Sequence, residues 1–218
     1  MKIYDVIVVG GGHAGCEAAH AAARAGASTL LVTMKLDGIG QMSCNPAIGG
    51  IGKSHLAREV DALDGLMCKA ADDSALQSRV LNSSKGAAVR ATRIQTCRNL
   101  YKKAIQNEIM FCKNLTVLQA SVESIIFKKD KTEGIKIDTG ESIKSKAVIL
   151  TAGTFLDGII HMGNKTFPAG RAGDKSSVEL EHFFRDMGFN IDRLKTGTPP
   201  RIKTQSIDFE KLQRQDSD

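Results

Sequence analysis

Three glycines near the N-terminus have the spacing of a phosphate-binding turn. Gly10, Gly12 and Gly15 form the pattern G-x-G-x-x-G between an apolar run and a segment of small residues. In such a turn the first glycine allows a tight bend, the second lets backbone approach a pyrophosphate, and the third lets a helix pack close to a strand. Free N–H groups at the helix start and the helix dipole favour negative charge. The pattern therefore predicts a dinucleotide-binding site.

The flanking segments have the composition of a strand–helix–strand unit that would position this turn. The apolar run 6–9 predicts one strand, and the run 29–32 predicts a second. Between them the alanine-rich stretch 14–25 predicts a helix, which Gly26 is placed to cap. An acidic residue that binds ribose is expected at the end of the second strand, where Thr33 stands instead. The unit by itself therefore predicts a dinucleotide without distinguishing FAD from NAD.

A second segment that could do chemistry is the glycine-rich stretch 37–54, which is predicted to be an irregular loop and carries Cys44 and Lys53. A cysteine becomes reactive when it is accessible and its pKa is lowered. Backbone N–H groups of the loop and the Lys53 ammonium could lower it, whereas a buried, inert thiol is the usual alternative. The sequence leaves a catalytic and a structural role for Cys44 open.

The end of this stretch resembles a nucleotide-binding P-loop, but the match fails. The motif G-x-x-x-x-G-K-[ST] needs a glycine where Ala47 stands, and it needs a preceding strand. The stretch is therefore interpreted as a second cradle for cofactor phosphate or flavin, with Lys53 as a nearby cation. A solvated loop lysine is the alternative.

The densest basic region lies between residues 84 and 103. Its cations could contact the phosphates of a polyanion, and they are Arg90, Arg93, Arg98, Lys102 and Lys103. A solvated helix face is the alternative, because no run of aromatic residues is interleaved with the charges. The formal net charge of +6 permits a polyanionic partner without requiring one.

Composition excludes several classes of protein. No apolar run approaches the roughly 20 residues that a membrane span needs, so no membrane segment is expected. The 5 cysteines are odd in number and widely spaced, without C-x-x-C. This argues against a disulfide framework and a zinc site, and it favours the reducing cytoplasm. No metal ligands are predicted.

The remaining elements change from helical to strand periodicity along the chain. Residues 55–112 are predicted as mostly helical, with a break near 82–86. Short strands are then expected to form a meander, at 117–127, 134–138 and 141–145. The run 147–151 predicts a strand buried on both faces. A helix is expected at 178–187 behind a capping box of Ser176 and Glu179, and another at the start of 209–218.

This order of elements predicts an α/β, Rossmann-like two-dinucleotide flavoprotein fold with a small three-stranded β-meander inserted. Thr151-Ala152-Gly153 matches the second strand-to-small-residue turn of such proteins, and the meander favours FAD over NAD. The predicted parts are an FAD-binding part at 1–116, the meander insertion at 117–146, a return to the FAD-binding domain at 147–200, and the start of a following segment at 201–218. The chain is expected to be the N-terminal portion of something longer.

Several motifs together resemble the MnmG (GidA) family of tRNA uridine modification enzymes. They are distributed over essentially the whole chain, at residues 10–15, 40–53, 59–63, 84–86, 88–93, 153–158, 170–174 and 193–201. The resemblance implies an FAD enzyme that adds a carboxymethylaminomethyl or aminomethyl group to C5 of the wobble uridine of tRNA. It implies methylene-tetrahydrofolate and NADH as co-substrates, a homodimer, and the GTPase MnmE as partner.

The resemblance also assigns roles to individual residues. The turn holds the FAD pyrophosphate through Gly10, Gly11, Gly12, His13, Ala14 and Gly15. Val122 matches an adenine-contacting position, Ser177 matches another FAD contact, and Cys44 matches a cysteine implicated in the chemistry. His13 is expected to pack rather than to act as a general base. The alternatives are a folate- and FAD-dependent tRNA uridine-C5 methyltransferase and a non-catalytic FAD- or NAD-binding module.

Overall fold

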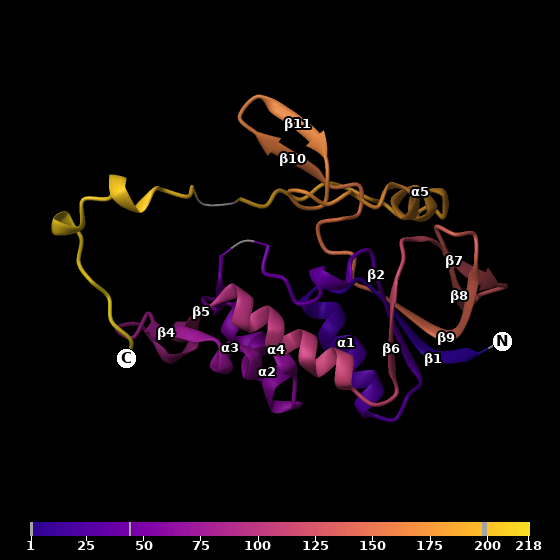
Figure 1. Cartoon of the computed structure of the whole chain (residues 1–218), viewed down its shortest axis with the longest axis horizontal. Helices are drawn as coiled ribbons and strands as arrows, with labels where there is room; N and C mark the ends of the chain where they lie inside the picture. The colour runs from indigo at the N-terminus through magenta and orange to yellow at the C-terminus, as the bar shows by residue number, and fades with distance from the viewer. Residues whose placement is uncertain (1, 44, 198–199) are drawn as a thin grey trace.

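In the computed structural model, which describes residues 2–43, 45–197 and 200–218, the chain is built around a six-stranded sheet of order β6-β2-β1-β9-β8-β7 (Figure 1). The first four strands in this order are parallel, β8 then pairs antiparallel with β9, and β7 pairs antiparallel with β8. Their bounds are β1 Ile3–Val9, β2 Thr29–Thr33, β6 Leu115–Gln119, β7 Val122–Lys128, β8 Lys131–Ile137 and β9 Ser142–Leu150. The prediction of an α/β fold is confirmed.

The predicted strand–helix–strand unit is present at the N-terminus. β1 is followed by helix α1 (His13–Arg24), which leads back to β2. Gly26 follows Ala25, the C-cap residue of α1, and its φ of +95° is a conformation that favours glycine. β1 and β2 are parallel neighbours, so the chain crosses over through α1 and returns to the same sheet.

Each face of the parallel strands is covered by a different set of elements (Figure 1). α1, α3 (Leu66–Asp73) and α4 (Arg98–Phe111) cover one face, where Val8 is fully buried. The meander and α5 (Val178–Asp186) contribute to the core on the other face, where Ile7 is fully buried. Successive side chains of a strand point to opposite faces, so neighbouring residues of β1 join different cores. Burial of one such side chain contributes about 1.5–3 kcal/mol.

The helical prediction for 55–112 is wrong in its middle. α2 (Lys53–Ala62), α3 and α4 are helices, but the residues between α3 and α4 form strands β4 (Ala75–Leu81) and β5 (Ala91–Thr96). With β3 (Ala47–Gly49) they make a separate antiparallel sheet of order β3-β5-β4. β3 also interrupts the segment that was predicted to be an irregular loop. The hydrogen-bond partners of β5 include β3, far away in sequence, and local periodicity does not reveal such pairing.

The strand boundaries after residue 112 also differ from the prediction. The segment 117–127 is divided between β6 and β7, because β6 pairs with β2 and the chain then turns back. β9 is continuous through the positions that were predicted as two strands. It is not buried on both faces, since Ile149 is 37% exposed. Ile149 pairs in register with Val8 and therefore points to the side covered by α1, and α1 packs mainly on β1 and β2 rather than on β9.

The predicted helix at 178–187 is confirmed as α5, but its capping box is wrong. Ser177 is the N-cap residue and makes no side-chain capping bond. Its backbone N–H instead donates to Phe155 O at 2.7 Å, which fixes the entry into the helix from a distant segment. The expected helix start near residue 209 is only the 3₁₀ turn Phe209–Lys211. Strands β10 (Ile159–Met162) and β11 (Lys165–Pro168) form a projecting hairpin that was not predicted (Figure 1).

No helix in the described part of the chain is long and apolar enough to cross a membrane. Among the same residues, no group of three or more His, Cys, Asp or Glu side chains is arranged to hold a metal ion.

Glu17 of α1 caps a different helix, and its replacement should destabilise the fold. Its carboxylate accepts the backbone N–H groups of Leu66 at 3.0 Å and Met67 at 2.7 Å, at the start of α3. The N-cap residue of α3 is a glycine without a side chain of its own, Gly65. Glu17→Ala leaves these donors unpaired, so the free energy of unfolding should fall by about 1–2 kcal/mol. Thermal unfolding measures this change.

The matched control is Glu59→Ala, which removes an exposed carboxylate from α2. That variant should unfold close to the wild-type temperature. Equal midpoints for the two variants would show that the contact between α1 and α3 contributes nothing to stability.

Candidate functional site

The glycine turn joins β1 to α1, and two of its glycines are required by the protein itself. Gly10 has φ +110°, and a Cβ atom there would lie 2.5 Å from the carbonyl oxygen of Thr151. A Cβ atom on Gly15 would overlap the carbonyl oxygen of Gly10. These positions therefore provide the tight bend and the close packing of helix on strand that the sequence predicts.

Gly12 is different, because nothing in the described part of the protein requires a glycine there. Its φ of −74° is open to any residue, and a Cβ atom would meet no described atom within 4 Å. It is the N-cap residue of α1, no side chain caps this end, and the first turn holds no acidic residue. An open helix N-terminus with space above it is a site for an anion. A pyrophosphate fits this position, and a side chain at residue 12 would fill the space that it needs.

The other residues of the turn are packed into the protein. A Cβ atom on Gly11 would lie 2.9 Å from Thr33 Oγ1 and 3.1 Å from Ile39. His13 begins α1, its ring centroid lies 5.5 Å from that of Tyr101, and its Nε2 is buried without a partner among the described residues. Desolvation lowers the pKa of His13, so the imidazole is neutral near pH 7. This environment suits a packing residue.

The end of β9 lies beside the turn. Thr151 donates its backbone N–H to Val9 O at 2.9 Å and its hydroxyl to the same oxygen at 2.8 Å. Because β1 and β9 are parallel neighbours, their carboxyl ends meet at one edge of the sheet. The small-residue segment Thr151–Gly153 therefore lies at the same edge as the glycine turn.

Charged residues that the sequence analysis did not single out lie just beyond β2. Lys35 forms an ion pair with Asp174, which also receives Arg171 Nε and Nη2 at 2.7 Å. The hydrogen bond from Lys35, and then the one from Arg171, hold the pKa of Asp174 below its usual value despite desolvation. The motif at 170–174 was noted in the sequence, but its contact with Lys35 depends on the tertiary structure. We call these three residues the latch.

The structure brings Val122 and the start of α5 into the same region. Val122 is 5% exposed and belongs to the core cluster that contains Val32 of β2 and Leu180 of α5. Ser177 precedes α5, and its carbonyl oxygen accepts the N–H of Asp157 at 3.1 Å. The segment that carries Ser177 follows the latch directly.

The glycine-rich segment is anchored on both sides of Cys44, which itself lies outside the described residues. Before it, Met42 is buried and its sulfur accepts the hydroxyl of Thr96 at 3.3 Å. After it, Pro46 O accepts the backbone N–H of Thr96 at 2.7 Å, and β3 follows. Lys53 is exposed at the start of α2. β3 is antiparallel to its neighbour in the side sheet, which is not the setting of a P-loop.

Burial makes Cys16, Cys68 and Cys112 poorer nucleophiles than a free cysteine. Burial raises the pKa of Cys16 to about 12. Burial also raises the pKa of Cys68 and of Cys112, though less strongly. Cys97, which is partly buried, is the N-cap residue of α4.

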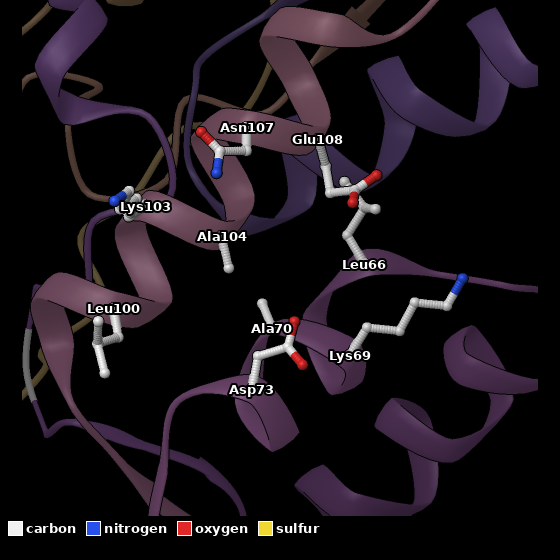
Figure 2. Close-up of a pocket in the computed structure, with 9 residues that line it drawn as sticks. All are labelled: Leu66, Lys69, Ala70, Asp73, Leu100, Lys103, Ala104, Asn107 and Glu108. Carbon is white, nitrogen blue, oxygen red and sulfur yellow. The ribbon is translucent and has the colours of Figure 1, made fainter.

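A cavity of about 260 Å³ lies between α3 and α4, apart from the turn (Figure 2). Its lining residues are Leu66, Lys69, Ala70, Asp73, Leu100, Lys103, Ala104, Asn107 and Glu108. None of the predicted cofactor-binding residues lines it. The cations of the predicted basic region lie on different elements, because Lys103 lines this cavity on α4 whereas Arg93 lies in β5.

A parallel sheet with an open glycine turn, continued by an antiparallel meander, defines a dinucleotide-binding α/β protein of the Rossmann-like flavoprotein type. The model of the glucose inhibited division protein A family matches residues 5–218, so the chain belongs to this family.

Solved structures agree with this assignment. GidA of Aquifex aeolicus is 45% identical with a TM-score of 0.94, and the match covers 99% of this chain and 36% of that one. A second crystal form has the same identity and TM-score. The chain therefore spans about a third of the length of this relative. A GidA-related protein of Thermus thermophilus shares the fold alone, at 18% identity and a TM-score of 0.64 over 87% of this chain and 70% of that one.

Proposed function

We propose that this chain is the FAD-binding part of an FAD-dependent tRNA-modifying enzyme. The observation that carries the proposal is the open N-terminus of α1 at Gly12, where the protein leaves space and unpaired backbone donors for a pyrophosphate. Membership of the GidA family supports tRNA modification and a flavin cofactor in general terms.

The specific reaction is the addition of a carboxymethylaminomethyl or aminomethyl group to C5 of the wobble uridine. Methylene-tetrahydrofolate would supply the one-carbon unit and NADH would be the reductant. The whole enzyme would act in the cytoplasm as a homodimer together with an MnmE-type GTPase. The motifs that resemble the MnmG family along the chain support this finer assignment.

Residues 10–15 would hold the pyrophosphate of FAD, Val122 would contact the adenine, and Ser177 would make a further contact. The bound flavin would supply redox chemistry. Carbon 5 of a pyrimidine is a poor nucleophile until a group adds at C6 or the enolate is stabilised. The thiolate of Cys44 would add at C6 or move the proton at C5.

The experiment uses the full-length protein purified with its bound cofactor. The cofactor released on denaturation should be FAD, identified by chromatography. Unmodified tRNA transcript incubated with methylene-tetrahydrofolate, NADH, a nitrogen donor and the MnmE-type GTPase should gain the modified uridine, identified by mass spectrometry of nucleosides. Formation of 5-methyluridine without the GTPase would instead identify the methyltransferase. If the protein binds FAD but forms no tRNA product, it is a non-catalytic FAD-binding module.

Opening the latch should weaken FAD binding. Asp174→Asn removes the charge that pairs with Lys35, so the segment leading to Ser177 should be held less firmly against the end of β2. We expect the dissociation constant for FAD to rise roughly 3- to 10-fold, which is on the order of 1 kcal/mol. Titration of apoprotein with FAD, followed by flavin fluorescence, measures this.

The control for this variant is Asp208→Asn, which removes an exposed ion pair with Lys211 far along the chain. It should bind FAD as the wild type does. If the two variants bind FAD equally well, the latch has no part in holding the cofactor.

A further inference from the structure

Two arginines lie directly opposite each other in the small sheet. Arg79 of β4 pairs in register with Arg93 of β5, so both side chains leave the same face. Further along the same face Gln77 is paired with Gln95, and all four residues are partly buried. We call them the arginine face. Like charges at opposed positions of a strand pair are destabilising, so this arrangement has a cost for the fold.

Neither guanidinium group is paired with a carboxylate in the described part of the chain, although the Asp218 carboxylate accepts the backbone N–H of Val80 next to Arg79. Neither arginine belongs to any of the ion pairs found there. The Nε atom of Arg93 is buried without a hydrogen-bond partner among the described residues. A buried donor without a partner costs on the order of 1–3 kcal/mol, and more when it is charged. The arginine face therefore carries two guanidinium groups without an ion-pair partner among the described residues.

Two side chains of the arginine face already donate hydrogen bonds to a neighbouring segment of the chain. Arg79 Nη1 donates to Asp216 O at 3.2 Å, and Gln77 Nε2 donates to Gln215 O at 2.6 Å. Both acceptors are neutral backbone carbonyl oxygens of an extended segment. They satisfy single donors but leave the charge of Arg79 uncompensated. An extended polymer with anionic oxygens would satisfy the same donors and also neutralise the charge.

The arginine face is connected to the segment that carries Cys44. β5 lies between β3 and β4, and Gly49 of β3 is the partner of Arg93 on the side away from Arg79. β3 follows Cys44 after only two residues. A ligand held on the arginine face would therefore lie on the sheet whose first strand leads out of that loop.

We propose that the arginine face binds a backbone phosphate of RNA, with Arg79 and Arg93 as its guanidinium ligands and Gln77 and Gln95 as adjacent donors. Guanidinium groups match phosphate geometry with two parallel N–H bonds, and two of them neutralise one phosphate well. This inference rests on the proposed function, since it names the surface that would hold the RNA substrate.

The other cations of the basic region are in different surroundings. Lys102 pairs with Asp37 at 2.7 Å, and Lys103 lines the cavity between α3 and α4. Outside that region, Arg58 donates to Thr92 Oγ1 at 3.3 Å, and Thr92 precedes Arg93 in β5, so the Thr92 side chain points to the opposite face of the strand. The arginine face is therefore separate from these cations and shares only Arg93 with the predicted basic region.

The test measures binding of an unmodified tRNA transcript to the full-length protein as a function of salt. Arg79→Gln and Arg93→Gln should each lower affinity roughly 3- to 10-fold near 0.1 M salt. Each should also reduce the slope of log binding constant against log salt by about one unit, because one phosphate contact is lost. Inorganic phosphate should compete with RNA in the wild type more strongly than in these variants.

Arg58→Gln is the matched control, because it removes an arginine of α2 that contacts β5 from the other face. It should leave affinity and salt slope unchanged. FAD absorbance and circular dichroism report whether each variant is folded, and Arg93→Lys retains the charge should Arg93→Gln fold poorly. Equal binding and an equal salt slope for Arg79→Gln and Arg58→Gln would overturn the proposal, and so would wild-type values for a folded Arg93→Gln. A wild-type protein that binds RNA through this face but forms no modified uridine would contradict the proposed function alone.

Discussion

Replacement of Gly12 by valine is expected to give a folded protein that purifies without FAD. A side chain at this position meets no described atom within 4 Å, and the backbone φ of −74° is normal for valine. The branched side chain would instead enter the space above the N-terminus of α1, where the pyrophosphate is proposed to lie. The affinity for FAD should fall at least about a hundredfold, or about 2.7 kcal/mol.

The measurement is the flavin absorbance of purified protein, followed by titration of FAD into the apoprotein. Gly86→Val is the matched control, because Gly86 has φ −61°, an extended ψ and open space around its Cβ direction. That variant should remain yellow. Retention of FAD by Gly12→Val with unchanged affinity would falsify the assignment of the turn. Gly15 is unsuitable for this test, because a Cβ there would collide with Gly10 O and disturb the fold itself.

Replacement of Cys44 by serine should abolish most of the tRNA modification while sparing FAD binding. Serine is nearly isosteric with cysteine, but its hydroxyl is a much weaker nucleophile and acid than a thiol. The rate should fall on the order of a hundredfold for a lost proton-transfer group, and further for a lost nucleophile. The assay is single-turnover modification of an unmodified tRNA transcript by the full-length enzyme with its GTPase partner.

Cys112→Ser is the control, since Cys112 lies at the C-terminal end of α4, whereas Cys16 contacts the glycine turn through a hydrogen bond from its Sγ to Gly11 O. Burial raises the pKa of Cys16 to about 12, so its thiol stays protonated and resists alkylation near pH 8. In the wild type, iodoacetamide should therefore react with Cys44 before Cys16, and protein alkylated at Cys44 should be inactive. Full activity of Cys44→Ser would return this cysteine to a structural role.

Local sequence patterns were sufficient where a structure is formed by neighbours in the chain. The apolar run before Gly10 and the alanine-rich helix after it were both predictable, because strand and helix periodicities are local. The helix α5 was predictable for the same reason. The role of Gly15 also follows from the turn, since its requirement arises from Gly10, whereas the requirement at Gly10 arises from Thr151 at the end of β9.

Long-range contacts decided the features that the sequence analysis missed. The segment containing Arg79 was predicted as helix, but it forms an edge strand, and its antiparallel pairing with β5 places Arg79 opposite Arg93. The contact of Lys35 with Asp174 joins residues separated by 139 positions. No periodic pattern encodes such contacts.

The amino-acid sequence by itself determined the kind of fold and the location of the dinucleotide turn, because glycine spacing and apolar runs act over short distances. Only the tertiary structure decided which glycine leaves space for a ligand. Gly10, Gly12 and Gly15 look equivalent in the sequence, yet the first and third face backbone atoms of the protein and the second faces open space. Only the tertiary structure also decided which cations are candidates to bind an anion, since folding leaves Arg79 and Arg93 without an ion-pair partner among the described residues.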